Sequence, residues 1–161
     1  MSLPSERLSE LGVSLPPVAP ALASYVPAVR IGDLVYSSGQ LPTVGGQLAA
    51  VGKVGAEVTV EEAAQCARTA ALNAVAAVSA EAGGVDEVLR VVKAVIFVAS
   101  APGFTAQAQV GNGASQVLQD IFGEAGRHAR SAVGVAVLPL DAPVEVELIV
   151  AVSPRPSVHL V

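Results

Sequence analysis

The sequence has little of several features that particular classes of protein need. Its 161 residues include one cysteine, no tryptophan and few other aromatic residues, and only 14% are charged. The single cysteine, Cys66, excludes an internal disulfide bond and a zinc site built from cysteines. Low charge together with 52% hydrophobic residues argues against intrinsic disorder. We therefore expect one folded domain in a reducing compartment, predict a cytoplasmic location, and interpret Cys66 as a small buried apolar residue.

Other absences limit the partners. The net charge is −5 and no lysine or arginine cluster occurs, so we expect no nucleic-acid partner. The longest apolar stretch, residues 138–152, is interrupted by acidic residues and prolines, so no membrane span is expected. The first residues are charged and do not resemble a secretory signal. A small chain so rich in Ala and Val has trouble covering itself with polar groups, which favours burial of apolar surface between subunits.

Two stretches give the clearest secondary-structure signals. Thr59 and Glu62 form a capping box at the start of a helix predicted over residues 59–82, which Gly83 and Gly84 end. Residues 91–98 form a β-branched, nearly continuous apolar run, as expected for a central strand buried on both faces.

The remaining signals complete a mixed sheet. We predict a second helix over residues 104–122, with its regular part starting near Asn112 because Gly111 and Gly113 each cost about 1 kcal/mol in a helix interior. Strands are predicted at residues 25–29, 34–38 and 47–51, with a turn at 43–47 and two more strands within 129–152. This order indicates an α+β fold, a mixed sheet with two helices packed on one face. Gly39, just after a strand, permits either an unusual backbone angle or a close approach.

Residues 129–152 carry the charges most suggestive of function. Arg130 stands at the start of an apolar strand, where a guanidinium can hold a carboxylate or phosphate; the alternatives are a surface arginine or a structural salt bridge with Glu145 or Glu147. Burial of Glu145 or Glu147 would raise its pKa and make it a usable base near neutral pH. Alternatively, both glutamates face water on an edge strand.

The spacing of Arg130 and Glu145 bears on where a site can form. If their two strands pair directly across the connection at residues 139–143, the residues lie about 25 Å apart. One chain then cannot bring both to a small substrate, and cooperation between them requires an oligomer. His128 could serve as a base but is also explained as a loop histidine, and with His159 it makes no metal cluster. No phosphate-binding glycine motif or nucleophile elbow is present.

Several motifs resemble the Rid family of reactive-intermediate deaminases, also known as YjgF-type or L-PSP endoribonuclease-like proteins. Residues 35–42, VYSSGQLP, are similar to the family's "(V/I)xxSGQ(I/L)P". Residues 129–147 are similar to its "ARSxVxVxxLPxxxxVEIE", and the strand at 92–98 and Tyr25-Val26 also match. The likeness covers residues 21–152, which we interpret as a single Rid-like domain between an N-terminal extension (1–20, a short helix plus a proline-rich segment) and a tail (153–161).

The resemblance implies a chorismate-mutase-like fold and a homotrimer with clefts between subunits. It implies that Arg130 holds the substrate carboxylate and that Glu145 activates the water that hydrolyses an imine or enamine such as 2-aminoacrylate, without cofactor or metal. It further implies that a small imine, enamine or keto-acid ligand is lined by a set of residues that comprises Tyr25, Ser38, Gly39, Ser115 and Ala132.

Two of these positions depart from the family pattern. Ala132 stands where catalytic members often carry cysteine, and Ser115 falls near a position where many carry asparagine. The alternative function is a non-catalytic trimer that binds small carboxylates at the same cleft. Ribonuclease activity is a third hypothesis, which the absence of a basic stretch and of a histidine pair disfavours.

Overall fold

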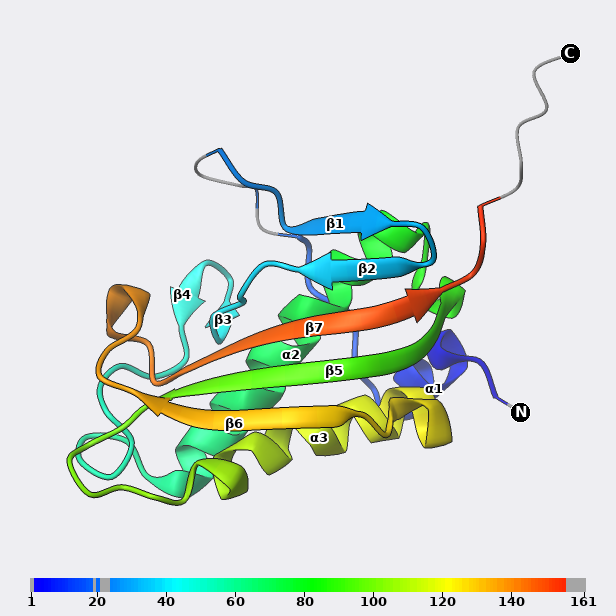
Figure 1. Ribbon diagram of the computed structural model, residues 1–161. Helices are drawn as coiled ribbons and strands as arrows, with labels where there is room; N and C mark the ends of the chain where they lie inside the picture. The colour runs from blue at the N-terminus through cyan, green and yellow to red at the C-terminus, as the bar shows by residue number, and fades with distance from the viewer. Residues whose placement is uncertain (1, 19, 21–23, 156–161) are drawn as a thin grey trace, which may run out of the picture.

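A twisted five-stranded sheet forms the centre of the molecule (Figure 1). The computed structural model describes residues 2–18, 20 and 24–155. The strand order is β1-β2-β7-β5-β6, in which only the β5–β6 pair is parallel. A separate two-stranded sheet, β3–β4, lies beside it. The strand bounds are β1 Ala28–Ile31, β2 Leu34–Ser37, β3 Thr43–Val44, β4 Gln47–Leu48, β5 Val88–Ala99, β6 Ala129–Val135 and β7 Val144–Val152.

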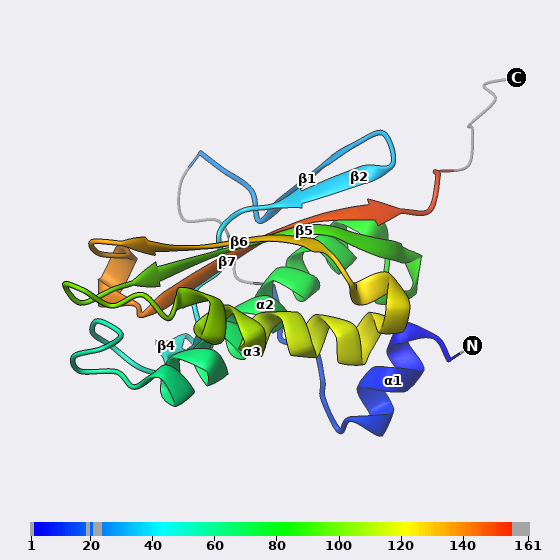
Figure 2. The same cartoon turned by 60° about the horizontal axis from the view of Figure 1, so that its bottom comes forward.

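Two long helices cover one face of this sheet, as Figure 2 shows. They are α2, Val60–Ala82, and α3, Gln107–Phe122, and they also pack against each other. The predicted α+β class, a mixed sheet with two helices on one face, is confirmed. A third helix, α1 (Pro4–Glu10), lies against the far end of α3, and short 3-10 turns occupy Val85–Glu87, Gly123–Gly126 and Pro139–Asp141.

The start of α2 follows the predicted capping box. The Thr59 hydroxyl accepts a hydrogen bond from the Glu62 amide at 3.2 Å, and the Glu62 carboxylate accepts one from the Thr59 amide at 2.8 Å. These bonds satisfy two amides that the helix itself leaves without partners. The helix ends at Gly83, whose φ of +98° is the left-handed conformation predicted for the terminator.

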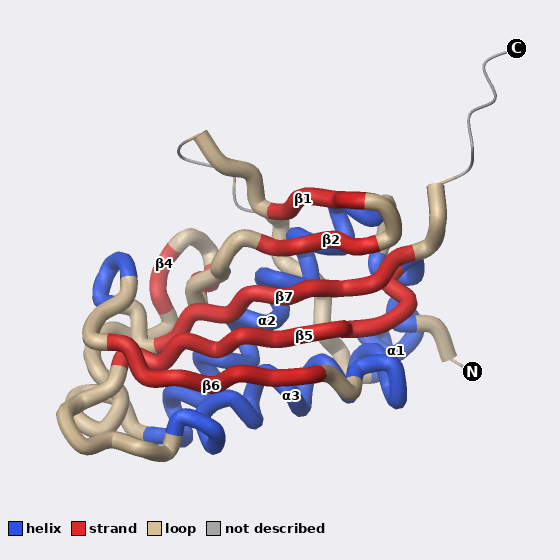
Figure 3. The backbone as a smooth tube through the Cα atoms, viewed as in Figure 1, coloured by secondary structure: helices blue, strands red, loops and turns tan. Residues whose placement is uncertain are grey.

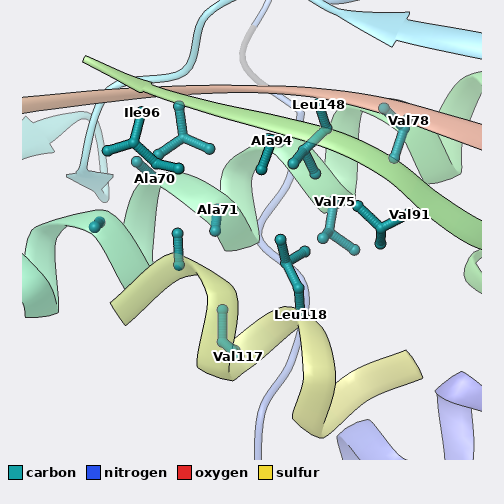
Figure 4. Close-up of a cluster of buried hydrophobic side chains, with 14 of the residues drawn as sticks. Ala70, Ala71, Val75, Val78, Val91, Ala94, Ile96, Val117, Leu118 and Leu148 are labelled. Carbon is teal, nitrogen blue, oxygen red and sulfur yellow. The ribbon is translucent and has the colours of Figure 1, made fainter. Parts of the chain in front are cut away.

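The core lies between the sheet and the two long helices (Figure 4). Side chains of β7 alternate strictly, so that every second residue from Val144 to Val152 is buried toward the helices. Cys66 is among the buried residues, as predicted, and burial raises the pKa of its thiol. The labelled members of the core are Ala70, Ala71, Val75, Val78, Val91, Ala94, Ile96, Val117, Leu118 and Leu148.

Helix α3 begins at Gln107, so the prediction that regular helix starts near Asn112 was wrong. The reason lies in what its glycines contact. A Cβ at Gly113 would overlap the backbone carbonyl of Ala64 in α2. Gly113 therefore lets two helix backbones approach closely, and this packing offsets the poor helix propensity of glycine.

Strand bounds also differ from the sequence prediction. Strand β1 spans Ala28–Ile31, so it begins three residues later and ends two residues later than the strand predicted at residues 25–29. Residues 43–47, predicted as a turn, form the β3–β4 hairpin with its bend at Gly45 and Gly46. Both glycines have positive φ, which is the conformation that a two-residue hairpin loop requires.

The last two strands do not form the hairpin that the sequence suggested. Strand β5 lies between them, parallel to β6 and antiparallel to β7 (Figure 3). The connection between β6 and β7 passes through the 3-10 turn Pro139–Asp141, where Leu140 and Asp141 both have a φ of +59°. Strand β7 is therefore interior to the sheet, and β6 is one of its edges.

The described part of the chain leaves several apolar side chains exposed on the sheet face away from the helices. Val29, Ile31, Tyr36 and Val133 on this face are each 40% or more exposed. The β5 residues on this face, such as Phe97, are half-buried, so the prediction that this strand is buried on both faces does not hold within one chain. Uncovered apolar faces of this extent are typical of interaction surfaces.

Candidate functional site

Arg130 lies at the start of the edge strand β6, and its side chain reaches helix α3. One terminal nitrogen, NH1, donates to the Asn112 side-chain oxygen at 2.9 Å and to the Ser115 hydroxyl at 3.2 Å. Asn112 and Ser115 are three residues apart, so they share one face of the helix. Arg130 forms no ion pair within the described part of the chain, which excludes the alternative of a salt bridge to Glu145 or Glu147 there.

The contacts of Arg130 leave one edge of its guanidinium free. Both hydrogens of NH1 are occupied by the two α3 acceptors. The Nε and NH2 groups have no hydrogen-bond partner among the described residues. These groups form a planar edge that suits the two oxygens of a carboxylate. Arg130 is thus held on one side and available on the other.

Ser115 connects Arg130 to His128. The Ser115 hydroxyl lies 3.0 Å from Nε2 of His128, and Nδ1 of the same ring lies 2.6 Å from the Gly126 carbonyl. A carbonyl can only accept, so Nδ1 donates to it, and the remaining ring nitrogen can accept from the Ser115 hydroxyl. Each atom in this chain then has a compatible partner, from Arg130 to Gly126.

Ala132 follows Arg130 on the same face of β6 and is partly buried against the core. A Cβ at Gly111 would lie 3.4 Å from the Cβ of Ala132 and 3.3 Å from NH1 of Arg130. Gly111 therefore allows α3 to approach the strand closely enough for Asn112 and Ser115 to reach the arginine. Four of these residues, Arg130, Ser115, Ala132 and Gly111, line one corner between β6 and α3, which we call the arginine half-site.

Glu145 lies on β7, on the sheet face away from the helices, and is half-buried. Burial raises the pKa of its carboxyl group, and the neighbouring charge of Glu147 raises it further. Since β7 is an interior strand, the alternative of an edge strand whose charges face water is wrong. A carboxylate with a raised pKa in an interior strand has the properties of a general base.

Gly39 packs directly against Glu145. A Cβ at Gly39 would overlap the Glu145 carboxylate, and the φ of Gly39 is not positive, so close approach is the reason for glycine here. Gln40 pairs with Val146 through backbone hydrogen bonds of 2.8 and 2.9 Å, which fixes this loop on β7. The Ser38 hydroxyl donates to the Val26 carbonyl at 2.6 Å.

That bond ties the Gly39 loop to the segment before β1. Tyr25, beside Val26, is 54% exposed. Glu145, Gly39 and Ser38 thus form a second region, which we call the glutamate half-site, and Tyr25 is connected to it only through its chain neighbour Val26.

The sheet register places the two half-sites about 14 Å apart, not 25 Å. Arg130 is opposite Ala94, which is opposite Leu148, whereas Glu145 is opposite Phe97. Three residues along the strands and two strand spacings across give roughly 10 Å in each direction between the Cα atoms.

The side chains nevertheless point to opposite faces, since Ala94 and Leu148 face the helices and Phe97 faces away. One chain therefore does not bring Arg130 and Glu145 together, because their side chains lie on opposite faces of the sheet and not because their Cα atoms are far apart.

A cavity of about 360 Å³ lies elsewhere, between the proline-rich segment and the β3–β4 hairpin. It contains none of the predicted site residues. Its lining residues are Pro16, Pro17, Val18, Pro20, Gln40, Thr43, Gly45, Gly46 and Asn73. Among the described residues, no group of three or more His, Cys, Asp or Glu side chains is arranged to hold a metal ion. No helix in this part of the chain has both the length and the apolar character to cross a membrane.

Comparison with known proteins identifies the family. The model of the family described as "YjgF/chorismate_mutase-like, putative endoribonuclease" matches residues 5–152. The chain belongs to this family. The resemblance noted in the sequence and the chorismate-mutase-like fold are therefore both confirmed.

Individual relatives agree with this assignment. Protein TCP17 of Trypanosoma cruzi is 46% identical over 150 residues, which cover 91% of this chain and 92% of that protein. The crystal structure of Atu1372 from Agrobacterium tumefaciens, a protein of unknown function, matches with a TM-score of 0.87 and 44% identity over 93% of this chain and 92% of that one. Escherichia coli TdcF, solved with bound serine, matches with a TM-score of 0.62 and 28% identity over 84% of this chain and 94% of that one.

Sequence reasoning missed the side chains that hold Arg130. The sequence analysis assigns Asn112 no role. His128 was considered only as a base or a loop residue. The available signal was the three-residue spacing of Asn112 and Ser115, which places two polar side chains on one helical face beside two glycines.

Proposed function

We propose that the chain is a cofactor-independent deaminase that hydrolyses small imines or enamines bearing a carboxylate, such as 2-aminoacrylate, at clefts between the subunits of a homotrimer. The observation that carries the proposal is the free Nε/NH2 edge of Arg130, held in place from its other side by Asn112 and Ser115. A guanidinium so arranged suits a substrate carboxylate.

Glu145 supplies the chemistry in this proposal. As a carboxylate it takes a proton from a water molecule, whose oxygen adds to the imine carbon of 2-iminopropanoate, the tautomer of 2-aminoacrylate. The nitrogen then receives this proton from Glu145, which gives the neutral carbinolamine. Glu145 next passes the hydroxyl proton of the carbinolamine to the same nitrogen, ammonia leaves as the C=O bond forms, and pyruvate remains. Burial raises the pKa of Glu145, which makes its carboxylate a stronger base toward water than an ordinary glutamate.

The geometry of the half-sites supports an oligomer in which two subunits share each site. Arg130 and Glu145 of one chain face opposite sides of the sheet, so a complete site needs Arg130 of one subunit and Glu145 of another. The same face carries Val29, Ile31, Tyr36 and Val133, and their exposure in the described part of the chain supports such an assembly.

The deaminase proposal is tested by generating 2-aminoacrylate in the assay and following keto-acid formation. We expect wild-type protein to accelerate ammonia release, and Arg130→Ala and Glu145→Ala each to reduce the rate about a hundredfold or more. Only Arg130→Ala should also abolish binding of 2-oxobutanoate, a keto acid that does not react, measured by calorimetry. Wild-type protein without acceleration would contradict the deaminase.

Shared sites are tested by mixing the two inactive variants after unfolding and refolding them together. If each site combines residues of two subunits, about a quarter of the sites in randomly mixed trimers regain both intact side chains. If both residues come from one chain, no activity returns. Light scattering of the wild-type protein checks the mass, which should be three times that of the chain.

A second candidate is a non-catalytic trimer that binds small carboxylates at the same clefts. It is favoured by TdcF, whose structure holds serine, itself a small carboxylate. This candidate predicts thermal stabilisation by 2-oxobutanoate that depends on Arg130 and not on Glu145, with no turnover. Endoribonuclease activity, which the family description names, is disfavoured by the net charge of −5, because RNA binding depends on basic contacts to phosphates.

A further inference from the structure

His128 ends a chain of hydrogen bonds that begins at the substrate-facing arginine. NH1 of Arg130 donates to the Ser115 hydroxyl at 3.2 Å, and that oxygen lies 3.0 Å from Nε2 of His128. The ring is held in turn by the Gly126 carbonyl, 2.6 Å from Nδ1. His128 itself is half-buried and touches Arg130 only through Ser115.

Gly126, at the far end of this series of hydrogen bonds, is held in place by the fold. Gly126 is buried, and a Cβ there would overlap the backbone of Leu118 and Gln119 in α3. Gly126, whose carbonyl orients His128, therefore packs against the same helix that carries Asn112 and Ser115. Arg130 and Gly126, the two ends of this series of hydrogen bonds, both contact α3, so the imidazole between them has one favoured orientation.

We propose that His128 is a positioning residue: acting through Ser115, it holds the Arg130 guanidinium so that the Nε/NH2 edge faces a ligand carboxylate. The proposal rests on the proposed role of Arg130 in carboxylate binding and adds a residue that does not touch the ligand.

The direction of the hydrogen bonds explains how His128 does this. The Ser115 hydroxyl has one hydrogen, and Nε2 of His128 accepts it when Nδ1 donates to Gly126. The lone pairs of the Ser115 oxygen then point toward Arg130 and receive NH1. Without an acceptor at residue 128 the hydroxyl rotates freely, and its oxygen no longer favours NH1. Arg130 would keep Asn112 alone and explore more rotamers, which lowers its affinity for a carboxylate.

The test compares two substitutions of the same residue. His128→Phe fills the space but cannot accept from Ser115, whereas His128→Gln offers an oxygen near the position of Nε2. We expect His128→Phe to weaken 2-oxobutanoate binding about three- to tenfold, the effect of one lost hydrogen bond. KM for 2-aminoacrylate generated in the assay should rise by a similar factor with kcat within about twofold, and His128→Gln should restore most of both.

A double-mutant cycle separates positioning from general structure. In a Ser115→Ala background, His128→Phe should change 2-oxobutanoate binding by less than about twofold, because the path to Arg130 is already broken. Gln116→Ala is the matched control, since Gln116 neighbours Ser115 but hydrogen-bonds Asp120 at 2.8 Å on another face of α3. It should bind as wild type. Nitrogen NMR of the imidazole should show Nδ1 as the protonated nitrogen.

Several results would overturn the proposal. Wild-type binding by His128→Phe would do so, as would an equal loss in the wild-type and Ser115→Ala backgrounds, or Nε2 as the protonated nitrogen. If Arg130→Ala binds 2-oxobutanoate as well as wild type, neither the carboxylate-binding role of Arg130 nor the positioning role of His128 is correct. If binding depends on Arg130 and His128 but no turnover occurs, the deaminase proposal is wrong and the positioning role of His128 is supported.

Discussion

The two half-sites are built in opposite ways. Arg130 is held by side chains, because Asn112 and Ser115 occupy NH1 and His128 supports Ser115. The Glu145 carboxylate has no hydrogen-bond partner among the described residues, and its position is set by burial and by the backbone at Gly39. The difference suits the proposed roles, since a carboxylate-binding group gains from a fixed orientation and a base gains from a raised pKa that hydrogen bonds would lower.

The largest effect should come from adding one methyl group to the glutamate half-site. Gly39→Ala places a Cβ where the Glu145 carboxylate lies and forces the base to move. Misplacing a catalytic group by about 1 Å costs roughly a hundredfold in rate, so we expect that loss in kcat. Binding of 2-oxobutanoate at Arg130 should stay within about threefold. A Gly39→Ala protein with normal kcat would show that Glu145 is not the base.

The arginine half-site is tested by a change that keeps its charge. Arg130→Lys retains a cation but loses the planar edge and the second acceptor contact of NH1. We expect 2-oxobutanoate binding, measured by calorimetry, to weaken about thirtyfold, whereas the pH dependence of the residual activity should be unchanged. Binding close to wild type would mean that a positive charge alone is enough to bind the carboxylate, and that the planar edge of the Arg130 guanidinium is not needed.

A smaller effect should follow from moving helix α3 as a whole. Gly113→Ala pushes a Cβ into the backbone of Ala64 and should cost about 2 kcal/mol of unfolding free energy, as overpacking does. Because α3 carries Asn112 and Ser115, carboxylate binding should weaken about fivefold, and the acid limb of the activity profile should not move. Denaturant unfolding and calorimetry measure the two effects. A shifted acid limb would mean that the two half-sites are coupled.

The charge of Glu147 tunes only the glutamate half-site. Glu145 must be ionised to act as a base, so activity falls as pH drops through its pKa, which lies above the ordinary 4.5 because of burial and then Glu147. Glu147→Gln removes the second cause and should move the acid limb of kcat/KM to lower pH, with the rate at pH 8 within about twofold of wild type. A limb that stays in place would contradict the assignment of Glu145.

The smallest effect concerns stability. A carboxyl group whose pKa is raised by folding favours the folded state when protonated, so its contribution is present below the unfolded pKa and is lost as pH rises through the folded pKa. The neutral variant Glu145→Gln avoids this loss and should melt about 2 °C above wild type at pH 7. The difference should vanish at pH values below 4, and thermal scans at both pH values measure it.

Features set by neighbouring residues were predictable from sequence, and those set by distant contacts were not. The Thr59–Glu62 capping box involves residues three apart, and it was confirmed. The close approach at Gly39 was one of two stated alternatives, and Glu145 decided between them. Gly113 was misread because its partner, Ala64, lies on another helix. The β5–β6 pairing was missed because a parallel pair is joined by a long crossover, here α3, and leaves no short turn signal.

Because of the same crossover, the contacts of the two half-sites join residues at very different separations along the sequence, which affects the order in which they form during folding. Arg130 meets its anchors, Asn112 and Ser115, over separations of 18 and 15 residues, within one β5–α3–β6 unit. Glu145 meets Gly39 across more than a hundred residues. Closing a longer loop costs more chain entropy, so local contacts tend to form first. We therefore expect the contacts of Arg130 to form before the contact between Glu145 and Gly39, so the proposed carboxylate-binding residue is positioned earlier in folding than the proposed base.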